Sequence, residues 1–286
     1  MEIKKVSVLG AGIMGAGIAH VAAAGGFPTK LYDIGNDILA GALKQIRANL
    51  AKGVELKKIT PAQMEAALSN IECCEDLDTA AQADFIIEAV PENIALKLKI
   101  YSALDKAARP ETCFATNTSG LSITELAAAT SRPQKFIGMH FFNPVHKMKL
   151  VEIIRGLETN EETFRITDEV ARRMGKETVS IRESPGFVTS RINALIGNEA
   201  FYMLQEGIAS AKDIDKALKL GLNHPMGPFE LVDLVGLDTR LSILTYLHQT
   251  LGEKYRPCPL LIQYVKAGRL GRKAGKGVYD YPENPS

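Results

Sequence analysis

The chain has 286 residues, of which 46% are apolar and 23% are charged, and its formal net charge is +1. This composition is ordinary for a globular protein of one large or two smaller domains, and it indicates neither a nucleic acid nor a membrane surface as partner. The spacing of the four cysteines, Cys73, Cys74, Cys113 and Cys258, fits neither a zinc site nor a disulfide framework. Neither a bilayer-length apolar run nor a signal-peptide pattern is present, so we expect a cytoplasmic protein without a bound metal.

The N-terminal segment predicts a strand, a tight turn and a helix. An apolar run from Val6 to Leu9 precedes the turn Gly10-Ala11-Gly12-Ile13-Met14-Gly15, and small residues follow to Ala24. Glycines at this spacing let the backbone turn, approach a pyrophosphate and pack the helix closely on a sheet. The helix N-terminus then offers N–H groups to the phosphates. We predict a dinucleotide site at Gly10, Gly12, Ile13, Met14 and Gly15; the alternative is a glycine turn that only packs the helix.

A second predicted strand, Thr29 to Tyr32, ends at Asp33. An acidic residue at this place in a dinucleotide-binding fold accepts hydrogen bonds from the adenosine ribose. It would repel a ribose 2′-phosphate, so Asp33 favours NAD over NADP as the cofactor.

A helical excursion of about residues 36–69 follows the second strand. Asn36 to Lys52 has the pattern of an amphipathic helix, and Thr60-Pro61-Ala62-Gln63 has capping-box spacing with proline at the first helical position. The excursion is rich in lysine, which is usual for a solvated helix face. We therefore predict a helical hairpin inserted into the α/β domain.

Polar residues follow the predicted strands, at the edge of the sheet where ligands bind in open α/β folds. The further strands are expected at residues 84–90, 113–116, 136–142, 150–155 and 178–181, with a helix at 161–175. The polar residues at the strand ends are Asp33, Glu92, Asn117, Ser119, His140 and Asn143.

His140 and Glu152 are the candidate catalytic pair. His140 lies at the end of one predicted strand and Glu152 lies in the next, so a hairpin of the two strands would let the side chains face each other. A carboxylate beside an imidazole fixes its tautomer and stabilises its protonated form, as a general base for alcohol oxidation requires. The alternative is a structural histidine. Of the other histidines, His20 is expected to be packed and His146 to be solvated.

Ser184-Pro185 is the predicted domain boundary, because the pattern after it is helical. Helices are expected at about 187–207, 211–221, 231–251 and 260–267, followed by a basic glycine loop at 271–277. The predicted fold is thus a Rossmann-type α/β domain of residues 1–184 with an inserted helical hairpin, plus an all-α domain of residues 185–286. The first helix of the second domain is too apolar to be covered by a monomer, which favours at least a dimer.

Several motifs in order resemble the L-3-hydroxyacyl-CoA dehydrogenase family over essentially the whole chain. They are the glycine turn, the stretches 84–93, 117–119 and 140–152, Pro185-Gly186-Phe187, His224-Pro225-Met226-Gly227-Pro228 and Gly275-Lys276-Gly277. The resemblance implies an NAD-binding N-terminal domain, a helical C-terminal domain that forms a homodimer, and an active site in the cleft. It also implies interconversion of (S)-3-hydroxyacyl-CoA and 3-oxoacyl-CoA.

The resemblance further implies a role for individual residues. His140 matches the base, Glu152 its partner, and Ser119 the serine that contacts the substrate oxygen. The cofactor positions are matched by Glu92, Lys97, Asn143 and Lys276, and we add Asn117 because it ends a strand. The helical excursion matches the region that receives the CoA tail, which makes Lys52 and Lys57 candidate phosphate ligands.

The chain departs from the family pattern at two positions. Ser190 stands where the family has an active-site asparagine, so a contact to the substrate carbonyl would be lost, lengthened or bridged by water. His146 stands where a proline-type residue is usual. Two other functions use the same fold: a sugar-acid dehydrogenase of the L-gulonate type, and an NAD-binding sensor or structural protein without turnover.

Overall fold

The computed structural model describes residues 2–281. Its chain divides into two compact units, Met1–Ser184 and Pro185–Ser286. Met1 and the last five residues of the predicted C-terminal domain, 282–286, lie outside the described residues. No helix within residues 2–281 is both long enough and apolar enough to cross a membrane.

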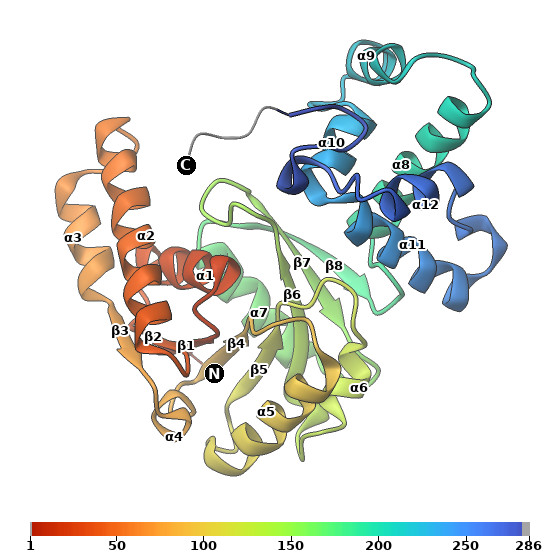
Figure 1. The fold of residues 1–286 in the computed structure, drawn as a ribbon. Coiled ribbons are helices and arrows are strands. Elements are labelled where there is room, and N and C mark those ends of the chain that lie inside the picture. The colour runs from red at the N-terminus through yellow and green to blue at the C-terminus, as the bar shows by residue number, and fades with distance from the viewer. Residues whose placement is uncertain (1, 282–286) are drawn as a thin grey trace. The chain divides into compact units, whose positions relative to one another are not determined.

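The N-terminal unit is built on one eight-stranded sheet with the order β3-β2-β1-β4-β5-β6-β7-β8 (Figure 1). Its strands are β1 (Val6–Leu9), β2 (Thr29–Tyr32), β3 (Ile71–Cys74), β4 (Phe85–Glu88), β5 (Cys113–Thr116), β6 (Phe136–Phe141), β7 (Leu150–Arg155) and β8 (Glu177–Arg182). All neighbouring strands are parallel except β6 and β7, which pair antiparallel. The strand order reverses direction between β1 and β4, the point at which ligands bind in such sheets. The predicted Rossmann-type fold is confirmed.

Burial explains the sequence of the central strands. Every residue of β1, β4, β5 and β6 is buried, so these strands are nearly continuous apolar runs rather than alternating ones. β3, at the edge of the sheet, has no buried residue and the sequence Ile-Glu-Cys-Cys. β3 was not predicted from the sequence, because this short edge strand has little of the apolar signal of its neighbours.

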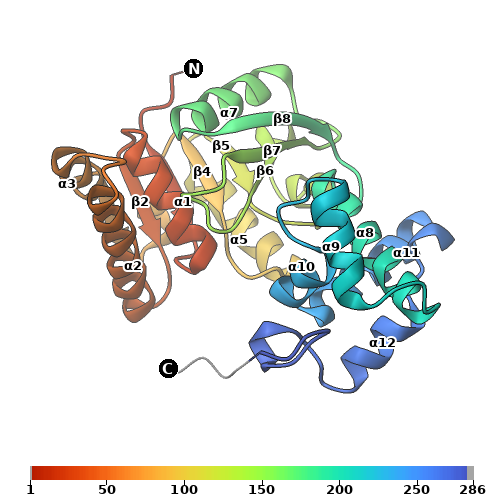
Figure 2. The same ribbon diagram turned by 90° about the horizontal axis from the view of Figure 1, so that it is seen from above.

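The helices of the N-terminal unit are α1 (Ile13–Ala24), α2 (Asn36–Glu55), α3 (Pro61–Ser69), α4 (Leu77–Ala80), α5 (Ile94–Ala107), α6 (Ile123–Ala127) and α7 (Glu161–Arg173), with a 3₁₀ turn η1 (Pro133–Lys135). The predicted hairpin insertion is confirmed as α2 and α3, which both pack against α1 (Figure 1). The Thr60 side chain accepts a hydrogen bond from Gln63 N and the Gln63 side chain accepts from Thr60 N, as its capping box predicts. α7 packs against β6, β7 and β8 (Figure 2).

The C-terminal unit is helical, with its own apolar core. Its helices are α8 (Thr189–Gln205), α9 (Ala211–Gly221), α10 (Pro228–Val235), α11 (Leu237–Leu251) and α12 (Pro259–Lys266), with 3₁₀ turns η2 (Glu253–Tyr255) and η3 (Arg272–Ala274).

The single helix predicted at 231–251 is wrong. The chain forms α10 and α11 there, and Gly236 separates them with a φ of +105°. This backbone conformation is open to glycine and strained for other residues, so the helix cannot continue through it.

Candidate active site

The turn between β1 and α1 leaves open space at the helix N-terminus. A Cβ at Gly10, where φ is +91°, would lie 2.8 Å from the Ala89 carbonyl oxygen, and a Cβ at Gly15 would lie 1.6 Å from the Gly10 carbonyl oxygen. These two glycines are therefore required for packing. A Cβ at Gly12 would meet nothing within 4 Å. This open backbone at a helix N-terminus fits a pyrophosphate.

Asp33 lies beside this turn. One of its carboxylate oxygens accepts a hydrogen bond from Ala11 N at 2.7 Å, which ties the end of β2 to the turn after β1. Within the same turn, Ile13 is exposed and Met14 is half-buried. The carboxylate is thus held at the switch point of the sheet, where it fits a ribose with free hydroxyl groups.

The predicted contact between His140 and Glu152 is confirmed. The two residues are directly opposite each other in the antiparallel β6–β7 pair. His140 Nδ1 and Glu152 Oε2 are 2.7 Å apart, and both side chains are buried. β6 ends one residue after His140, so the imidazole lies at the carboxyl end of its strand.

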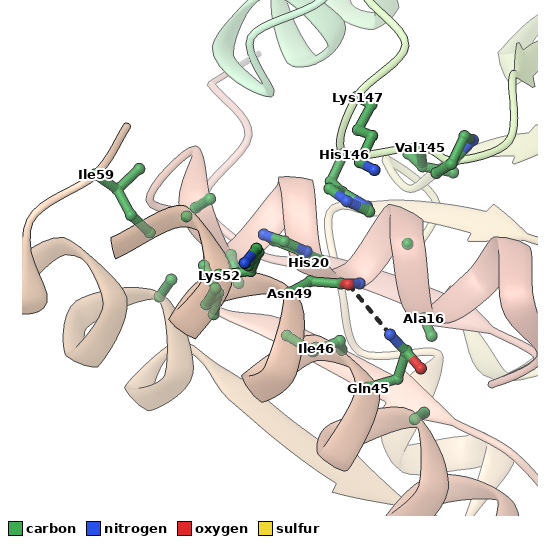
Figure 3. Close-up of a pocket in the computed structure, with 18 of the residues that line it drawn as sticks. Ala16, His20, Gln45, Ile46, Asn49, Lys52, Ile59, Val145, His146 and Lys147 are labelled. Carbon is green, nitrogen blue, oxygen red and sulfur yellow. Dashed lines mark hydrogen bonds between the residues drawn. The ribbon is translucent and has the colours of Figure 1, made fainter. Parts of the chain in front are cut away.

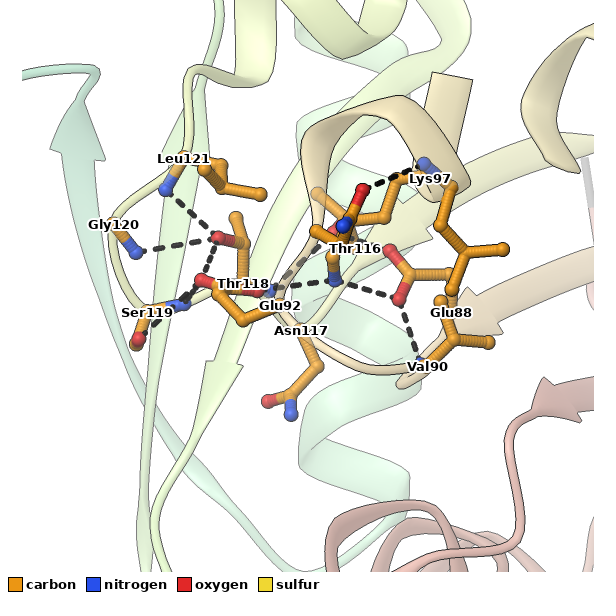
Figure 4. A network of polar contacts seen from close by, with 12 residues as sticks. Glu88, Val90, Glu92, Lys97, Thr116, Asn117, Thr118, Ser119, Gly120 and Leu121 are labelled. Carbon is orange, nitrogen blue, oxygen red and sulfur yellow. Dashed lines mark hydrogen bonds and ion pairs between the residues drawn. The ribbon is translucent and has the colours of Figure 1, made fainter. Parts of the chain in front are cut away.

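Other predicted residues cluster at the ends of β4 and β5. Asn117 Oδ1 accepts a hydrogen bond from Phe141 N at 2.9 Å, which joins the end of β5 to that of β6 beside His140. Glu92 Oε1 accepts from Ser119 N at 3.0 Å and from Ser119 Oγ at 3.4 Å (Figure 4). The Ser119 side chain is exposed, and its backbone is held by the hydrogen bond to Glu92.

A buried ion-pair network underlies this cluster, and sequence reasoning found only part of it. Lys97 Nζ is 2.7 Å from Glu88 Oε1 and 3.2 Å from Glu92 Oε2, and the Lys97 side chain is 1% exposed (Figure 4). Glu88 is fully buried and also accepts from Thr116 Oγ1 at 2.7 Å and Val90 N at 2.8 Å. The ammonium of Lys97, predicted at the cofactor, is here bound by two carboxylates. The sequence contains one indication of this network, which is the glutamate that ends the otherwise apolar strand β4.

A cavity of about 1130 Å³ lies along α1, α2, α3 and the segment after β6 (Figure 3). Lys52 lines it, and its Nζ is 2.7 Å from Glu55 Oε1. Lys57 is exposed but is not among the lining residues, whereas Lys58 is. Exposed Asn143 lines the cavity too, and its peptide bond to Pro144 is cis.

His146 is only partly solvated, whereas full solvation was predicted. His146 is half-buried and stacks on His20, with 5.5 Å between the ring centroids and an interplanar angle of 13°. His20 is buried, as predicted. Burial, aided by the charges of His146 and Lys176, lowers the pKa of His20 to about 4. The stacking was missed because the two residues come from segments far apart in the sequence.

This lowered pKa makes the stability of the protein depend on pH. The unfolded chain binds a proton at His20 near pH 6.5 and the folded chain only near pH 4, so the free energy of unfolding falls as the pH falls through this window. Relative to pH 8, the loss at pH 5 from His20 is about 2 kcal/mol. We expect urea unfolding, followed by circular dichroism, to show a smaller loss in a His20→Gln variant by about that amount. An equal pH dependence of the two proteins would contradict this role of His20.

Two predicted residues belong to the C-terminal unit. Ser190 is half-buried in the first turn of α8. Lys276 lies in the glycine loop, where its exposed Nζ is 3.8 Å from a carboxylate oxygen of Asp280. Within residues 2–281, no group of three or more histidine, cysteine, aspartate or glutamate side chains could hold a metal ion.

Comparison with known families matches nearly the whole chain. Residues 5–184 match the family described as 3-hydroxyacyl-CoA dehydrogenase, NAD binding domain. Residues 186–281 match the family described as 3-hydroxyacyl-CoA dehydrogenase, C-terminal domain.

Individual proteins are similar over the same length. The chain is 49% identical over 287 residues to a probable 3-hydroxybutyryl-CoA dehydrogenase of Bacillus subtilis, covering 100% of both chains. It is 49% identical over 280 residues to a 3-hydroxybutyryl-CoA dehydrogenase of Bradyrhizobium diazoefficiens, covering 98% of this chain and 96% of the other. Among solved structures, the (S)-3-hydroxybutyryl-CoA dehydrogenase of Ralstonia eutropha matches with a TM-score of 0.96 and 42% identity, covering 99% of this chain and 100% of that one.

Proposed function

This chain belongs to the 3-hydroxyacyl-CoA dehydrogenase family, and we propose that it interconverts (S)-3-hydroxybutyryl-CoA and acetoacetyl-CoA with His140 as general base. It is an NAD-dependent oxidoreductase of that family. The observation that carries the proposal is the 2.7 Å contact between the buried carboxylate of Glu152 and His140 Nδ1 at the end of β6. The names of the relatives, 3-hydroxybutyryl-CoA dehydrogenases, support a short acyl chain.

The residues around the glycine turn fit NAD. The backbone at Gly12 is open, and Asp33 is fixed beside it by the hydrogen bond from Ala11 N. NAD held at this turn would supply a hydride acceptor for the hydroxyl-bearing carbon of the substrate, and NADH would supply a hydride donor for the ketone. Asp33 would meet a 2′-phosphate with like charge, which supports NAD(H) over NADP(H).

His140 moves the proton that accompanies the hydride. In the oxidative direction its neutral ring accepts the substrate hydroxyl proton, and in the reductive direction the imidazolium returns it to the forming alcohol. Because the Glu152 carboxylate engages Nδ1, we assign proton transfer to Nε2. The carboxylate holds the Nδ1–H tautomer and compensates the charge that the ring gains.

Ser119 and the cavity complete the proposed substrate site. The hydroxyl of Ser119 is exposed, and Glu92 holds the backbone that carries it, which supports a contact to the substrate oxygen. The cavity beside α2 and α3 is lined by Lys52, and its volume of about 1130 Å³ is large enough for a CoA tail, which supports an acyl-CoA substrate. For Lys57, Asn143, Lys276 and Ser190 the proposed roles rest on the family resemblance. The homodimer and the cytoplasmic location also stay predictions.

The test is the loss of NADH absorbance on addition of acetoacetyl-CoA, with NADPH and free acetoacetate in parallel assays. We expect fast loss only with NADH and the thioester together. Equal rates with NADPH would contradict the selector role of Asp33. No loss in protein that binds NADH would overturn the proposed reaction and favour the sugar-acid or non-catalytic function.

Ser190 gives a prediction about substrate binding. Serine offers one short hydroxyl where the family has an amide, so a Ser190→Asn variant is expected to lower the KM for acetoacetyl-CoA by about the value of one hydrogen bond, or ~5-fold. Steady-state kinetics at saturating NADH measures the change. Unaltered KM and turnover would reject a substrate contact at this position.

A further inference from the structure

The segment from Asn143 to Lys149 connects β6 to β7 and carries a proposed cofactor ligand, Asn143. Two backbone groups within it, Lys147 N and Met148 N, donate to the Pro144 carbonyl oxygen at 2.9 and 3.0 Å. The segment is thus a tight turn, and both hydrogen bonds fix the backbone of Pro144, the residue that follows Asn143.

One side of this turn packs against α1. A Cβ at Gly17 would lie 2.8 Å from Val145 Cβ, so only a glycine lets the helix approach so closely. One turn further along α1, His20 stacks on His146 (Figure 3). His20 Nδ1 has no hydrogen-bond partner within residues 2–281. In the described part of the chain, packing rather than hydrogen bonding joins the turn to this helix.

A buried lysine also binds the turn. Lys176 follows α7 and is 7% exposed. Its Nζ donates to the Val145 carbonyl oxygen and, at 2.8 Å, to that of Met148. Hydrogen bonds from a charged donor are among the stronger ones in proteins, so the ammonium fixes the turn at two points.

We propose that Lys176 is a positioning residue: its ammonium holds the backbone of Val145 and Met148 and thereby sets Asn143 in place for the cofactor. The role of Asn143 rests on the proposed function, whereas the contacts of Lys176 do not. The titratable groups that face the turn are His20 on α1, His146 and Lys147 within the turn, and Lys176. Burial, then the charges of Lys147 and Lys176, lowers the pKa of His146, which keeps both stacked rings uncharged near neutral pH.

The test compares Lys176→Met with Lys149→Met, which removes the same charge from an exposed position at the end of the turn. We expect the Kd for NADH, measured by fluorescence titration without acyl-CoA, to rise by about tenfold only in Lys176→Met. NMR titration of the imidazole protons should also show higher pKa values for His20 and His146 in that variant, because a nearby positive charge is gone.

A second variant keeps the proposal testable if Lys176→Met does not fold. Gly17→Ala pushes on the Val145 side chain from α1 and leaves Lys176 intact, and it should raise the Kd for NADH in the same way. Wild-type affinity in either variant, once folded, would overturn the proposal. Since NADH binding needs no acyl-CoA, a failure of the proposed reaction would appear separately, as wild-type protein that binds NADH without oxidising it.

Discussion

A His140→Gln variant is expected to bind NADH normally while its turnover of acetoacetyl-CoA falls by at least about a hundredfold. Glutamine keeps a polar side chain of similar reach, but its amide neither accepts nor releases a proton near neutral pH. Binding of NADH should persist because the glycine turn and Asp33 are positioned by β1 and β2, away from β6 in the sheet order. Stopped-flow absorbance gives the turnover, and fluorescence titration gives the affinity.

A Glu152→Gln variant tests the other residue of the proposed catalytic pair. The carboxylate is fully buried and 2.7 Å from His140 Nδ1. An amide NH₂ donates to Nδ1 when the ring proton is on Nε2, and that tautomer cannot accept the substrate proton. The neutral amide also lacks the negative charge that stabilises the imidazolium. We therefore expect a loss of similar size, with little further loss in the double variant because the two residues act as a unit.

The control is His248→Gln, which removes a partly exposed histidine on α11. It should retain full turnover and so separate the role of His140 from a general effect of losing an imidazole. Near-normal turnover in either member of the proposed pair would reject proton transfer through His140. A parallel loss of NADH affinity would instead indicate a disturbed fold.

Sequence patterns predicted most of the fold where local chemistry is decisive. The glycine turn has one structural solution between a buried strand and a helix, because Gly10 and Gly15 leave no room for a side chain. The start of α3 follows from the capping box of Thr60 and Gln63, which is a local motif. The break at Gly236 was missed because one glycine is tolerated in many helices, and only its positive φ ends this one.

The candidate site was predictable where it follows strand register. His140 and Glu152 face each other because β6 and β7 form an antiparallel pair joined by a short segment. Contacts between segments far apart in the sequence were not predictable in this way. His20 and His146 stack only because α1 packs against the turn after β6. No sequence periodicity in either segment predicts that packing.

A Lys97→Met variant is expected to lose about 3 to 5 kcal/mol of stability in the N-terminal unit, because it leaves buried carboxylate charge without its cation. The Lys97 ammonium is bound by Glu88 at 2.7 Å and Glu92 at 3.2 Å, and Glu88 is fully buried. The hydrogen bonds that Glu88 accepts from Thr116 and Val90 remain, but they do not replace a full positive charge. Native-state hydrogen exchange of the β4 and β5 amides measures the loss within this unit, since a two-unit protein need not unfold in one step.

A double variant with Glu88→Gln separates charge from packing. The amide introduced by Glu88→Gln would retain hydrogen bonds to its neighbours without a charge, so adding this substitution to Lys97→Met should recover a large part of the lost stability. Lys99→Met, at an exposed position on the same helix, is the matched control and should leave exchange unchanged. If Lys97→Met were as stable as this control, or if the double variant were less stable than Lys97→Met alone, the buried lysine would not be the cation that stabilises these carboxylates.

Because Glu92 in turn accepts from Ser119 N, the same loss of charge is expected to loosen the strand end that carries the proposed substrate contact.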